Sequence, residues 1–290
     1  MKLRFVLLGH PVAHSMSPAI HQAAYDALGL PHRYELIDAP GEAEVASAVE
    51  ALRRGEIAGA NVTIPWKRVA LRLADVADAS ASEIGAANVL VRSADRGIVA
   101  YNTDVLALRE ELALLVPEPR RIVVIGSGGA ALAAVASARG LGAEVGVVAR
   151  SFDPKTKLAT VSEEFVRLGA TPLTWPMLDP ASRFYDFVKQ ADIVVQATSA
   201  GMHGADGGET VAELVPWAEL PAHAAAYDLV YNPPTTPFLK RARAASRRAE
   251  GGLGMLVGQA RAAIELLLGA APPKEPLLAA AQAALAARFH

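Results

Sequence analysis

The sequence contains no cysteine, which excludes disulfide bonds and thiolate metal sites. Its seven histidines are scattered, without an H-x-H or H-E-x-x-H pattern, so we expect no metal site. The 28 basic and 30 acidic residues nearly cancel, with a formal net charge of -2. This balance gives no electrostatic basis for binding nucleic acid or an anionic membrane surface.

Long apolar runs are also missing. No stretch approaches the roughly 20 residues needed to span a bilayer, although mean hydropathy is positive because alanine is abundant. The first 15 residues lack the apolar core of a secretory signal, so we expect a cytoplasmic protein. At 290 residues the chain is long enough for two modest domains with a well-buried core.

The most informative stretch is RIVVIGSGGAALAAVASARGLGAEVGVVARS, residues 121–151. Its β-branched run 122–125 is typical of a parallel strand buried on both faces. The spacing Gly126-x-Gly128-x-x-Ala131 then fits the G-x-G-x-x-G/A turn of dinucleotide-binding proteins, and an Ala-rich helix and a second apolar strand follow in the required order. We therefore predict dinucleotide binding, with backbone N–H groups at the helix start holding the phosphates.

The end of the second strand bears on the choice of cofactor. NAD-binding proteins carry an acidic residue about 20 positions on, which holds the ribose 2′-hydroxyl. This chain has Ala149-Arg150-Ser151 there. A guanidinium and a hydroxyl suit a 2′-phosphate, so we predict NADP. The alternative is a solvated arginine that merely ends the strand.

The first part of the chain alternates predicted strands and helices. Strands are predicted at residues 4–8, 34–37, 58–63, 88–91 and 98–101. Ser17 precedes Pro18 at the start of a predicted helix, where serine is a favoured N-cap and proline a favoured first residue. The alternative is that Ser15 and Ser17 together hold a substrate carboxylate at the helix N-terminus.

One lysine stands where a cation is disfavoured. Pro65 predicts the first residue of a helix, which puts Lys67 in the first turn, at the positive end of the dipole. A lysine there is mildly misplaced for stability, so we consider it a candidate for proton transfer. The alternative is a surface lysine that reaches into water. Asp104 begins another predicted helix, after Asn102 and Thr103, and the dipole alone accounts for it.

Asparagines stand at the ends of three predicted strands, namely Asn61, Asn88 and Asn102. Strand ends of one α/β sheet converge on one edge, so these side chains are expected to lie together. Amide groups gathered there suit a small ligand with several hydroxyl groups.

With these residues assembled, the chain resembles the shikimate/quinate dehydrogenase family over essentially its full length. The motifs that carry the resemblance occur in the family's order: H-S-x-S-P at 14–18, N-V-T-x-P-x-K at 61–67, G-A-x-N at 85–88, N-T-D at 102–104, G-x-G-G-A at 126–130, A-T-x-x-G-M at 197–202, Y-N-P at 231–233 and G-M-L-V-x-Q at 254–259. Each motif alone is weak evidence, but their shared order is specific.

The resemblance implies an α/β protein of two domains. A substrate-binding domain would comprise residues 1–103, completed by 240–290, and a Rossmann-type NADP-binding domain would comprise 104–239. The implied reaction is the reversible NADP-dependent reduction of 3-dehydroshikimate to shikimate in aromatic amino-acid biosynthesis. The implied partners are this substrate and the cofactor, in a monomer or homodimer.

The resemblance also implies roles for individual residues. Lys67 and Asp104 would form the catalytic pair. Substrate binding is implied for Ser15, Ser17, Asn61, Thr63, Asn88, Tyr231 and Gln259. Cofactor binding is implied for Gly126, Ser127, Gly128, Gly129, Ala130, Arg150, Ser151, Thr198, Met202, Leu229, Gly252 and Met255.

The chain departs from the family's usual pattern at four places: Ala149 and Ser151 around Arg150, Val89 after Asn88, Gln196 before the A-T motif, and Leu106-Ala107-Leu108 after N-T-D. Two other functions therefore stay open. One is a quinate or quinate/shikimate dehydrogenase, which Ser17 and Arg150 disfavour. The other is a non-catalytic nucleotide-sensing module, which has no need to retain both Lys67 and Asp104.

Overall fold

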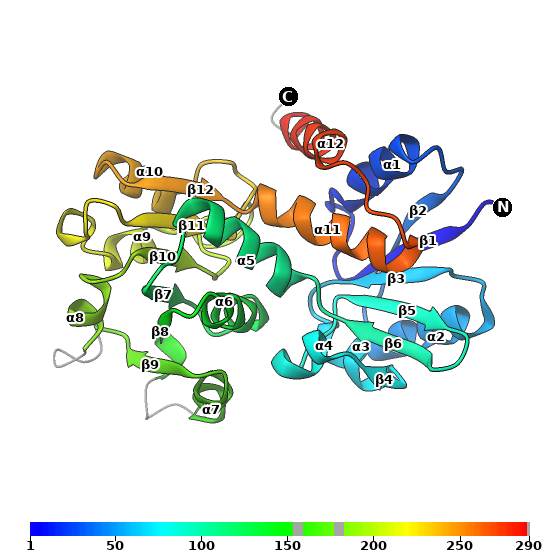
Figure 1. The fold of residues 1–290 in the computed structure, drawn as a ribbon, viewed down its shortest axis with the longest axis horizontal. Coiled ribbons are helices and arrows are strands. Elements are labelled where there is room, and N and C mark those ends of the chain that lie inside the picture. The colour runs from blue at the N-terminus through cyan, green and yellow to red at the C-terminus, as the bar shows by residue number, and fades with distance from the viewer. Residues whose placement is uncertain (153–158, 177–182, 289–290) are drawn as a thin grey trace. The chain divides into compact units, whose positions relative to one another are not determined.

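The computed structural model describes residues 1–152, 159–176 and 183–288, without the side chains of 159–162. The chain divides into two compact units, residues 1–107 with 256–290 and residues 108–255. Each unit is built on its own six-stranded sheet (Figure 1). The chain passes from one unit to the other within helix α5 (Asp104–Leu115) and returns within helix α11 (Leu253–Leu268).

The other elements of the first unit are β1 (Arg4–Gly9), α1 (Ser17–Ala27), β2 (Arg33–Asp38), α2 (Glu42–Arg54), β3 (Gly59–Val62), α3 (Lys67–Leu73), β4 (Val76–Ala77), α4 (Ala79–Ile84), β5 (Val89–Ser93), β6 (Gly97–Tyr101) and α12 (Lys274–Ala286). Those of the second unit are β7 (Arg121–Ile125), α6 (Gly129–Gly140), β8 (Glu144–Ala149), the 3-10 turn η1 (Arg150–Phe152), α7 (Ala159–Arg167), β9 (Ala170–Thr174), α8 (Phe184–Val188), β10 (Ile193–Gln196), α9 (Glu209–Leu214), η2 (Trp217–Glu219), β11 (Ala225–Asp228), α10 (Pro237–Ala244) and β12 (Arg248–Gly251).

The first sheet is mixed, with strand order β2-β1-β3-β5-β6-β4. Strands β2, β1 and β3 are parallel, whereas β5 is antiparallel to both β3 and β6. As a result, Asn61 in β3, Asn88 just before β5 and Asn102 just after β6 lie at the same edge. The expected convergence is present, but Asn88 reaches this edge at the start of its strand and not at the end.

Side chains alternate between the two faces of the first sheet, as the pleat of a strand requires. In β1, Val6 and Leu8 pack in a buried cluster with residues of α2, α3 and α4. Phe5 and Leu7 face the opposite way, in a cluster with Tyr25 of α1 and the end of α11. Helix α12 packs against α1 on this second face.

The second sheet is entirely parallel, with strand order β12-β11-β10-β7-β8-β9. In chain order from the β9 edge, this is the 3-2-1-4-5-6 arrangement of doubly wound dinucleotide-binding folds. The order reverses between β7 and β10. Ligands of such sheets bind outside the carboxyl ends of the strands at this switch point, where the glycine turn after β7 and Thr198 after β10 are found.

Both faces of the second sheet are covered. Ile122 and Val124 of β7 pack in one buried cluster with residues of α5, α6 and Phe165 of α7. Val123 and Ile125 pack in the other, with residues of α8, α9 and α10. Burial on both faces explains why this strand reads as a continuous apolar run, because neither side meets water.

Part of the predicted substrate domain belongs to the second compact unit, residues 108–255. The resemblance implies that residues 240–255 belong to the first domain, but they include most of α10, and they include β12, which pairs with β11 in the second sheet. The sequence does not indicate this strand, because Arg248–Gly251 lacks the apolar run of a central strand and lies at the sheet edge. No helix among the described residues is long and apolar enough to cross a membrane.

Candidate active site

Lys67 and Asp104 form an ion pair at the edge where the asparagines converge. Lys67 is the first residue of α3, and Asp104 is the first residue of α5. The Lys67 Nζ lies 2.7 Å from the Asp104 Oδ2, and the side chains are 28% and 12% exposed. The pair is therefore largely screened from water but still open on one side.

The Asp104 carboxylate is held from several directions. Its second oxygen, Oδ1, accepts a 2.9 Å hydrogen bond from the Asn88 Nδ2. Its backbone N–H donates to the Asn102 Oδ1 at 3.0 Å. One oxygen therefore faces lysine and the other asparagine, which fixes the orientation of the carboxylate.

A buried network continues from Asn88 into the last part of the chain. The Asn88 Oδ1 accepts from the Thr103 backbone N–H at 2.8 Å, and its Nδ2 donates to the Thr103 Oγ1 at 3.0 Å. The Thr103 Oγ1 in turn donates to the backbone carbonyl of Gln259 at 3.1 Å. This contact places Gln259 of α11 beside the start of α5, and its own Nε2 donates to the Leu256 carbonyl at 2.9 Å.

Asn102 does not fit the predicted role of binding the hydroxyl groups of a ligand through its amide. Its Nδ2 donates to the Ala86 carbonyl at 2.9 Å, and its Oδ1 accepts from Asp104. Both ends of the amide are used inside the protein. Asn102 therefore fastens the start of α5 to the turn before Asn88, which accounts for it structurally.

The start of α1 differs from the sequence prediction. Met16 is the N-cap residue, without a side-chain cap, and Ser17 is already inside the helix, so its predicted capping role is wrong. The Ser15 Oγ accepts from the Ser17 backbone N–H at 3.1 Å. The Ser17 side chain is buried. The hydroxyl of Tyr34 in β2 donates to the Asn61 Oδ1 at 2.9 Å, a contact that the sequence does not indicate because a tyrosine in a strand is typical of a core residue.

The turn before α3 also differs from the prediction. Pro65 follows a cis peptide bond and lies outside the helix, whose N-cap is Trp66. The Trp66 N–H donates to the carbonyl of Thr63, which closes the turn at 2.9 Å. Lys67 is thus the first helical residue and not the third, but it still lies at the positive end of the helix dipole.

In the second unit, different physical requirements explain why glycine occupies each position of the turn after β7. Gly126 has φ of +139°, and a Cβ there would lie 2.8 Å from the Ala197 carbonyl oxygen. Gly128 is the N-cap residue of α6, and an added Cβ at Gly128 or Gly129 would meet no atom within 4 Å. Gly126 is therefore required by the protein itself, whereas Gly128 and Gly129 leave open space over the exposed helix start, as a phosphate cradle needs.

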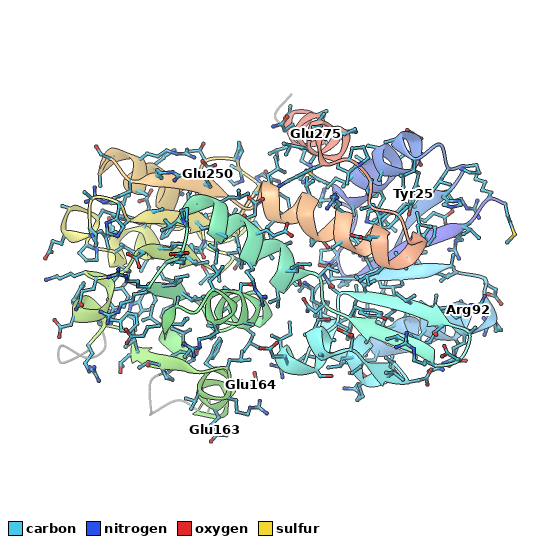
Figure 2. The ribbon with its side chains drawn as sticks, viewed as in Figure 1. Tyr25, Arg92, Glu163, Glu164, Glu250 and Glu275 are labelled. Carbon is cyan, nitrogen blue, oxygen red and sulfur yellow. The ribbon has the colours of Figure 1, made fainter. Side chains whose placement is uncertain are left out.

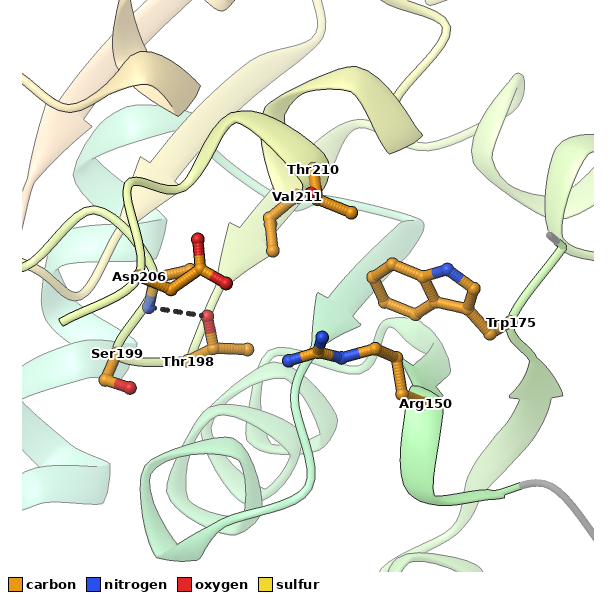
Figure 3. Close-up of a pocket in the computed structure, with 8 residues that line it drawn as sticks. Arg150, Trp175, Thr198, Ser199, Asp206, Thr210 and Val211 are labelled. Carbon is orange, nitrogen blue, oxygen red and sulfur yellow. Dashed lines mark hydrogen bonds between the residues drawn. The ribbon is translucent and has the colours of Figure 1, made fainter. Parts of the chain in front are cut away.

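The end of β8 is cationic and polar. Arg150 is exposed, and the Ser151 Oγ donates to the Ser127 Oγ at 2.8 Å, so this strand end is tied to the glycine turn. Figure 3 shows the Arg150 guanidinium extending into a cavity that Trp175 and Thr198 also line. Asp206 lines the same cavity, but its Oδ1 is occupied by the Gly208 backbone N–H at 3.1 Å.

The turn after β10 is stabilised by hydrogen bonds to the side chain of Gln196, one of the departures from the family pattern. Its buried side chain accepts from the Thr198 N–H and donates to the Ala200 carbonyl at 2.9 Å. The Thr198 Oγ1 accepts from the Ala200 N–H at 3.1 Å. The glutamine amide thus shapes this turn, and Met202 beyond it is 45% exposed.

The other residues with implied cofactor roles have mixed surroundings. A Cβ at Gly252 would lie 2.2 Å from the Leu229 carbonyl oxygen, so packing alone requires this glycine. Leu229 and Met255 pack against the second unit's core. Tyr231 follows β11 in the second unit, just before the cis Asn232–Pro233 bond.

Comparison with protein families gives three matches. Residues 7–90 match "Shikimate dehydrogenase substrate binding domain", and residues 252–282 match "Shikimate 5'-dehydrogenase C-terminal domain". Residues 108–207 match "Alanine dehydrogenase/PNT, C-terminal domain". The two shikimate dehydrogenase matches lie in the segments that bracket the second unit.

Similar proteins point the same way over the whole chain. "Shikimate dehydrogenase (NADP(+))" of Geobacter metallireducens is 38% identical over 92% of this chain and 91% of its own length, and that of Thermus thermophilus is 37% identical over 98% and 99%. The crystal structure of Thermus thermophilus shikimate 5-dehydrogenase, solved with NADP(H) and shikimate, has a TM-score of 0.81 at 34% identity, over 98% of this chain and 100% of that one. This chain belongs to the shikimate dehydrogenase family.

Proposed function

We propose that this protein is an NADP-dependent shikimate dehydrogenase, which reversibly reduces 3-dehydroshikimate to shikimate. The observation that carries the proposal is the Lys67–Asp104 ion pair, 2.7 Å between Nζ and Oδ2, at an edge lined by amide side chains. The names of its relatives support the same reaction, as does the solved structure with NADP(H) and shikimate.

Reduction of the ring ketone requires a hydride and a proton. NADPH, when bound, supplies the hydride to the carbonyl carbon. The Lys67 ammonium donates its proton to the carbonyl oxygen, which would otherwise become an alkoxide. In the reverse direction the neutral lysine removes the proton from the hydroxyl group, as a general base.

Asp104 keeps the lysine in place for this step. Its carboxylate attracts the ammonium at 2.7 Å, and Asn88 prevents the carboxylate from rotating away. The carboxylate also opposes the unfavourable dipole at the start of α3. Asp104 is therefore expected to orient the proton donor and, as in the family, to contact a substrate hydroxyl.

The remaining polar residues of this edge are proposed to bind the substrate. Ser15 and Ser17 would hold the carboxylate, because both are near the positive end of α1. Ring hydroxyls would be bound by Asn61, Thr63, Tyr231 and Gln259. Asn88, whose amide is engaged by Thr103 and Asp104, would act in substrate binding by supporting Asp104. Apart from Tyr231, all of these residues belong to the first unit.

The second unit is proposed to hold NADP. The open helix start at Gly128 and Gly129 fits the pyrophosphate, and the Arg150 cation with Ser151 fits a 2′-phosphate. The other proposed cofactor contacts are Gly126, Ser127, Ala130, Thr198, Met202, Leu229, Gly252 and Met255. We further propose that the protein works in the cytoplasm, as a monomer or homodimer, without nucleic acid as a partner.

The test is steady-state kinetics with shikimate and NADP, followed at the NADPH absorbance band, with quinate as the competing substrate. We expect turnover of shikimate, and a loss of about 10²–10⁴-fold in kcat for Lys67→Ala, the usual contribution of general acid–base catalysis. Calorimetry on the same variant should still detect shikimate binding. A kcat that falls less than about tenfold would assign Lys67 a positioning role only, and turnover of quinate alone would identify the paralogous activity.

A further inference from the structure

The side chain of Gln196 is fully buried in the second unit, and the reaction described above does not use it. Gln196 is the last residue of β10, which lies between β7 and β11 (Figure 2). Its backbone carbonyl accepts from the Leu229 N–H at 2.9 Å. The sheet therefore fixes the backbone of Gln196, and its amide extends from a defined position.

The chain leaves the sheet directly after Gln196. The Ala197 N–H still donates to the Ile125 carbonyl of β7, at 2.8 Å. The next N–H, that of Thr198, donates instead to the Gln196 Oε1, and the Ala200 carbonyl accepts from the Gln196 Nε2 at 2.9 Å. One side chain therefore supplies to the turn the hydrogen bonds that a neighbouring strand supplies within the sheet.

The same turn determines how the Thr198 hydroxyl can be used. Its Oγ1 accepts from the Ala200 N–H at 3.1 Å (Figure 3). A hydroxyl group has one proton and two lone pairs, so this bond uses a lone pair and leaves the proton available to a ligand. The turn therefore presents Thr198 as a hydrogen-bond donor.

The turn forms part of the wall of the cavity into which the Arg150 guanidinium extends. Residues 198–200 all line this cavity (Figure 3). They also lie close to the glycine turn after β7, because a Cβ at Gly126 would be 3.3 Å from the Thr198 Cγ2. A displacement of residues 198–200 would therefore change the shape of the cavity and its contact with the glycine turn.

We infer that Gln196 is a positioning residue for the adenosine end of NADP. It holds residues 198–200 in place, so that the Thr198 hydroxyl can donate to a phosphate or ribose oxygen beside the Arg150 cation. Because its side chain is fully buried, Gln196 acts through the turn and does not touch the cofactor. This inference rests on the proposed function, since it takes NADP as the ligand.

The experiment measures ligand binding to Gln196→Met by calorimetry. Methionine is equally long and unbranched, but it lacks the amide that bonds to the turn. The probes are NADP and adenosine 2′,5′-bisphosphate, which has the adenosine and the 2′-phosphate but no nicotinamide. We expect Kd to rise about tenfold for both probes, as for a lost hydrogen bond that serves a charged group. The kcat at saturating NADP and KM for shikimate should stay within about threefold, because only binding of the cofactor is weakened.

A double-mutant cycle tests whether Gln196 acts through Thr198. Thr198→Val keeps the shape of the side chain and removes the hydroxyl that donates to the ligand. In the Thr198→Val background, Gln196→Met should raise Kd for NADP no more than about twofold, because the contact that Gln196 positions is already lost. Two independent effects would instead add.

Asp192→Ala is the matched control, at the opposite end of the same strand. The Asp192 Oδ2 accepts from the backbone N–H groups of Arg120 and Arg121 at 2.7 and 2.9 Å, just before β10 and β7 begin. This variant also removes side-chain hydrogen bonds to two backbone groups of the second sheet, so it should lower the melting temperature. It should leave Kd for both probes unchanged, because Asp192 does not line the Arg150 cavity.

Four results would overturn the inference while the proposed function stands: an unchanged Kd in Gln196→Met, a rise for NADP without one for the bisphosphate, the same rise in both backgrounds, or an equal rise in Asp192→Ala. If Gln196→Met does not fold, Gln196→Asn takes its place. Asparagine keeps a buried amide but is one methylene shorter, so it cannot bond to both groups of the turn, and Kd should still rise at least about threefold. Failure of the unmutated protein to bind NADP or to oxidise shikimate would instead refute the proposed function.

Discussion

At the scale of single residues, Arg150 carries the proposed preference for NADP. Its guanidinium points into the cavity that Trp175 and Thr198 line, and no acidic residue ends β8. Because NADP differs from NAD by the 2′-phosphate, Arg150→Ala should raise KM for NADP far more than KM for NAD. Steady-state kinetics with both cofactors measures this.

Arg167→Ala offers a matched control for this change, because Arg167 is an exposed arginine of α7 in the same unit. Both Michaelis constants should be unchanged in that variant. Comparable kcat/KM with NADP and NAD in the unmutated protein would contradict the assignment of Arg150.

Asp228 gives a second prediction at this scale, which concerns stability. Its carboxylate is fully buried and accepts from the Val230 N–H at 2.9 Å and from the Thr236 Oγ1 at 2.6 Å. Burial raises its pKa from 3.8 to about 6, although the Thr236 hydrogen bond opposes this. Between about pH 4 and 6 the folded protein therefore holds more protons at this site than the unfolded chain, so stability falls as pH rises and levels off above 6.

Asp228→Asn should remove this pH dependence. The raised pKa of Asp228 corresponds to roughly 3 kcal/mol. The free energy of unfolding of the variant minus that of the unmutated protein should therefore increase by up to this amount from pH 4 to pH 7. Urea unfolding at several pH values measures the difference, in which all other titrating groups cancel. Parallel curves for the two proteins would show that Asp228 does not have the raised pKa.

At the scale of one structural element, the glycine turn after β7 contains one glycine that the fold requires, Gly126, and one that the proposed cofactor site requires, Gly128. Gly126→Ala combines a positive φ with a Cβ 2.8 Å from the Ala197 carbonyl oxygen, so it should destabilise the protein by roughly 1–3 kcal/mol. Gly128→Ala meets nothing and should leave stability unchanged, yet its methyl group would occupy the space proposed for the pyrophosphate.

The two variants are thus controls for each other. Thermal unfolding without cofactor should lower the melting temperature of Gly126→Ala alone. Titration with NADP should show weaker binding in Gly128→Ala, by about tenfold or more if one phosphate hydrogen bond is lost. Unchanged NADP affinity in Gly128→Ala would place the pyrophosphate elsewhere.

At the scale of the whole molecule, substrate and cofactor functions are distributed over two units with separate cores. The described contacts of Lys67 and Asp104 lie in the first unit, and those of Arg150 lie in the second. Binding of each ligand alone should therefore be separable. Lys67→Ala should bind NADP in the absence of shikimate with a Kd within about twofold of the unmutated protein, and Arg150→Ala should do the same for shikimate.

Calorimetry on the binary complexes tests this expectation. A large loss of NADP binding in Lys67→Ala would mean that removing this lysine disturbs the second unit. The assignment of the functions to the two units would then need revision.

Much of the second unit could be predicted from the sequence because its signals are local. A strand buried on both faces must be apolar throughout, and a tight βα turn must carry glycine, so residues 121–151 predicted their own fold and ligand class. Strand β12 escaped because edge strands need no apolar run. The pairing of Lys67 with Asp104 was implied by resemblance alone, since 37 residues of chain separate them.

The sequence by itself determined the fold class, the family, and the residue types available for chemistry, because these depend on periodicity, glycine positions and ordered motifs. Only the tertiary structure decided what each polar residue does. Asn102 donates to the Ala86 carbonyl and so anchors the start of α5, whereas Asn88 donates to the Asp104 carboxylate, although the two residues looked alike in the sequence. The antiparallel β5, which brings Asn88 to this edge at the start of its strand, made this difference, because a hydrogen bond depends on distance and direction in space, which residue spacing does not encode.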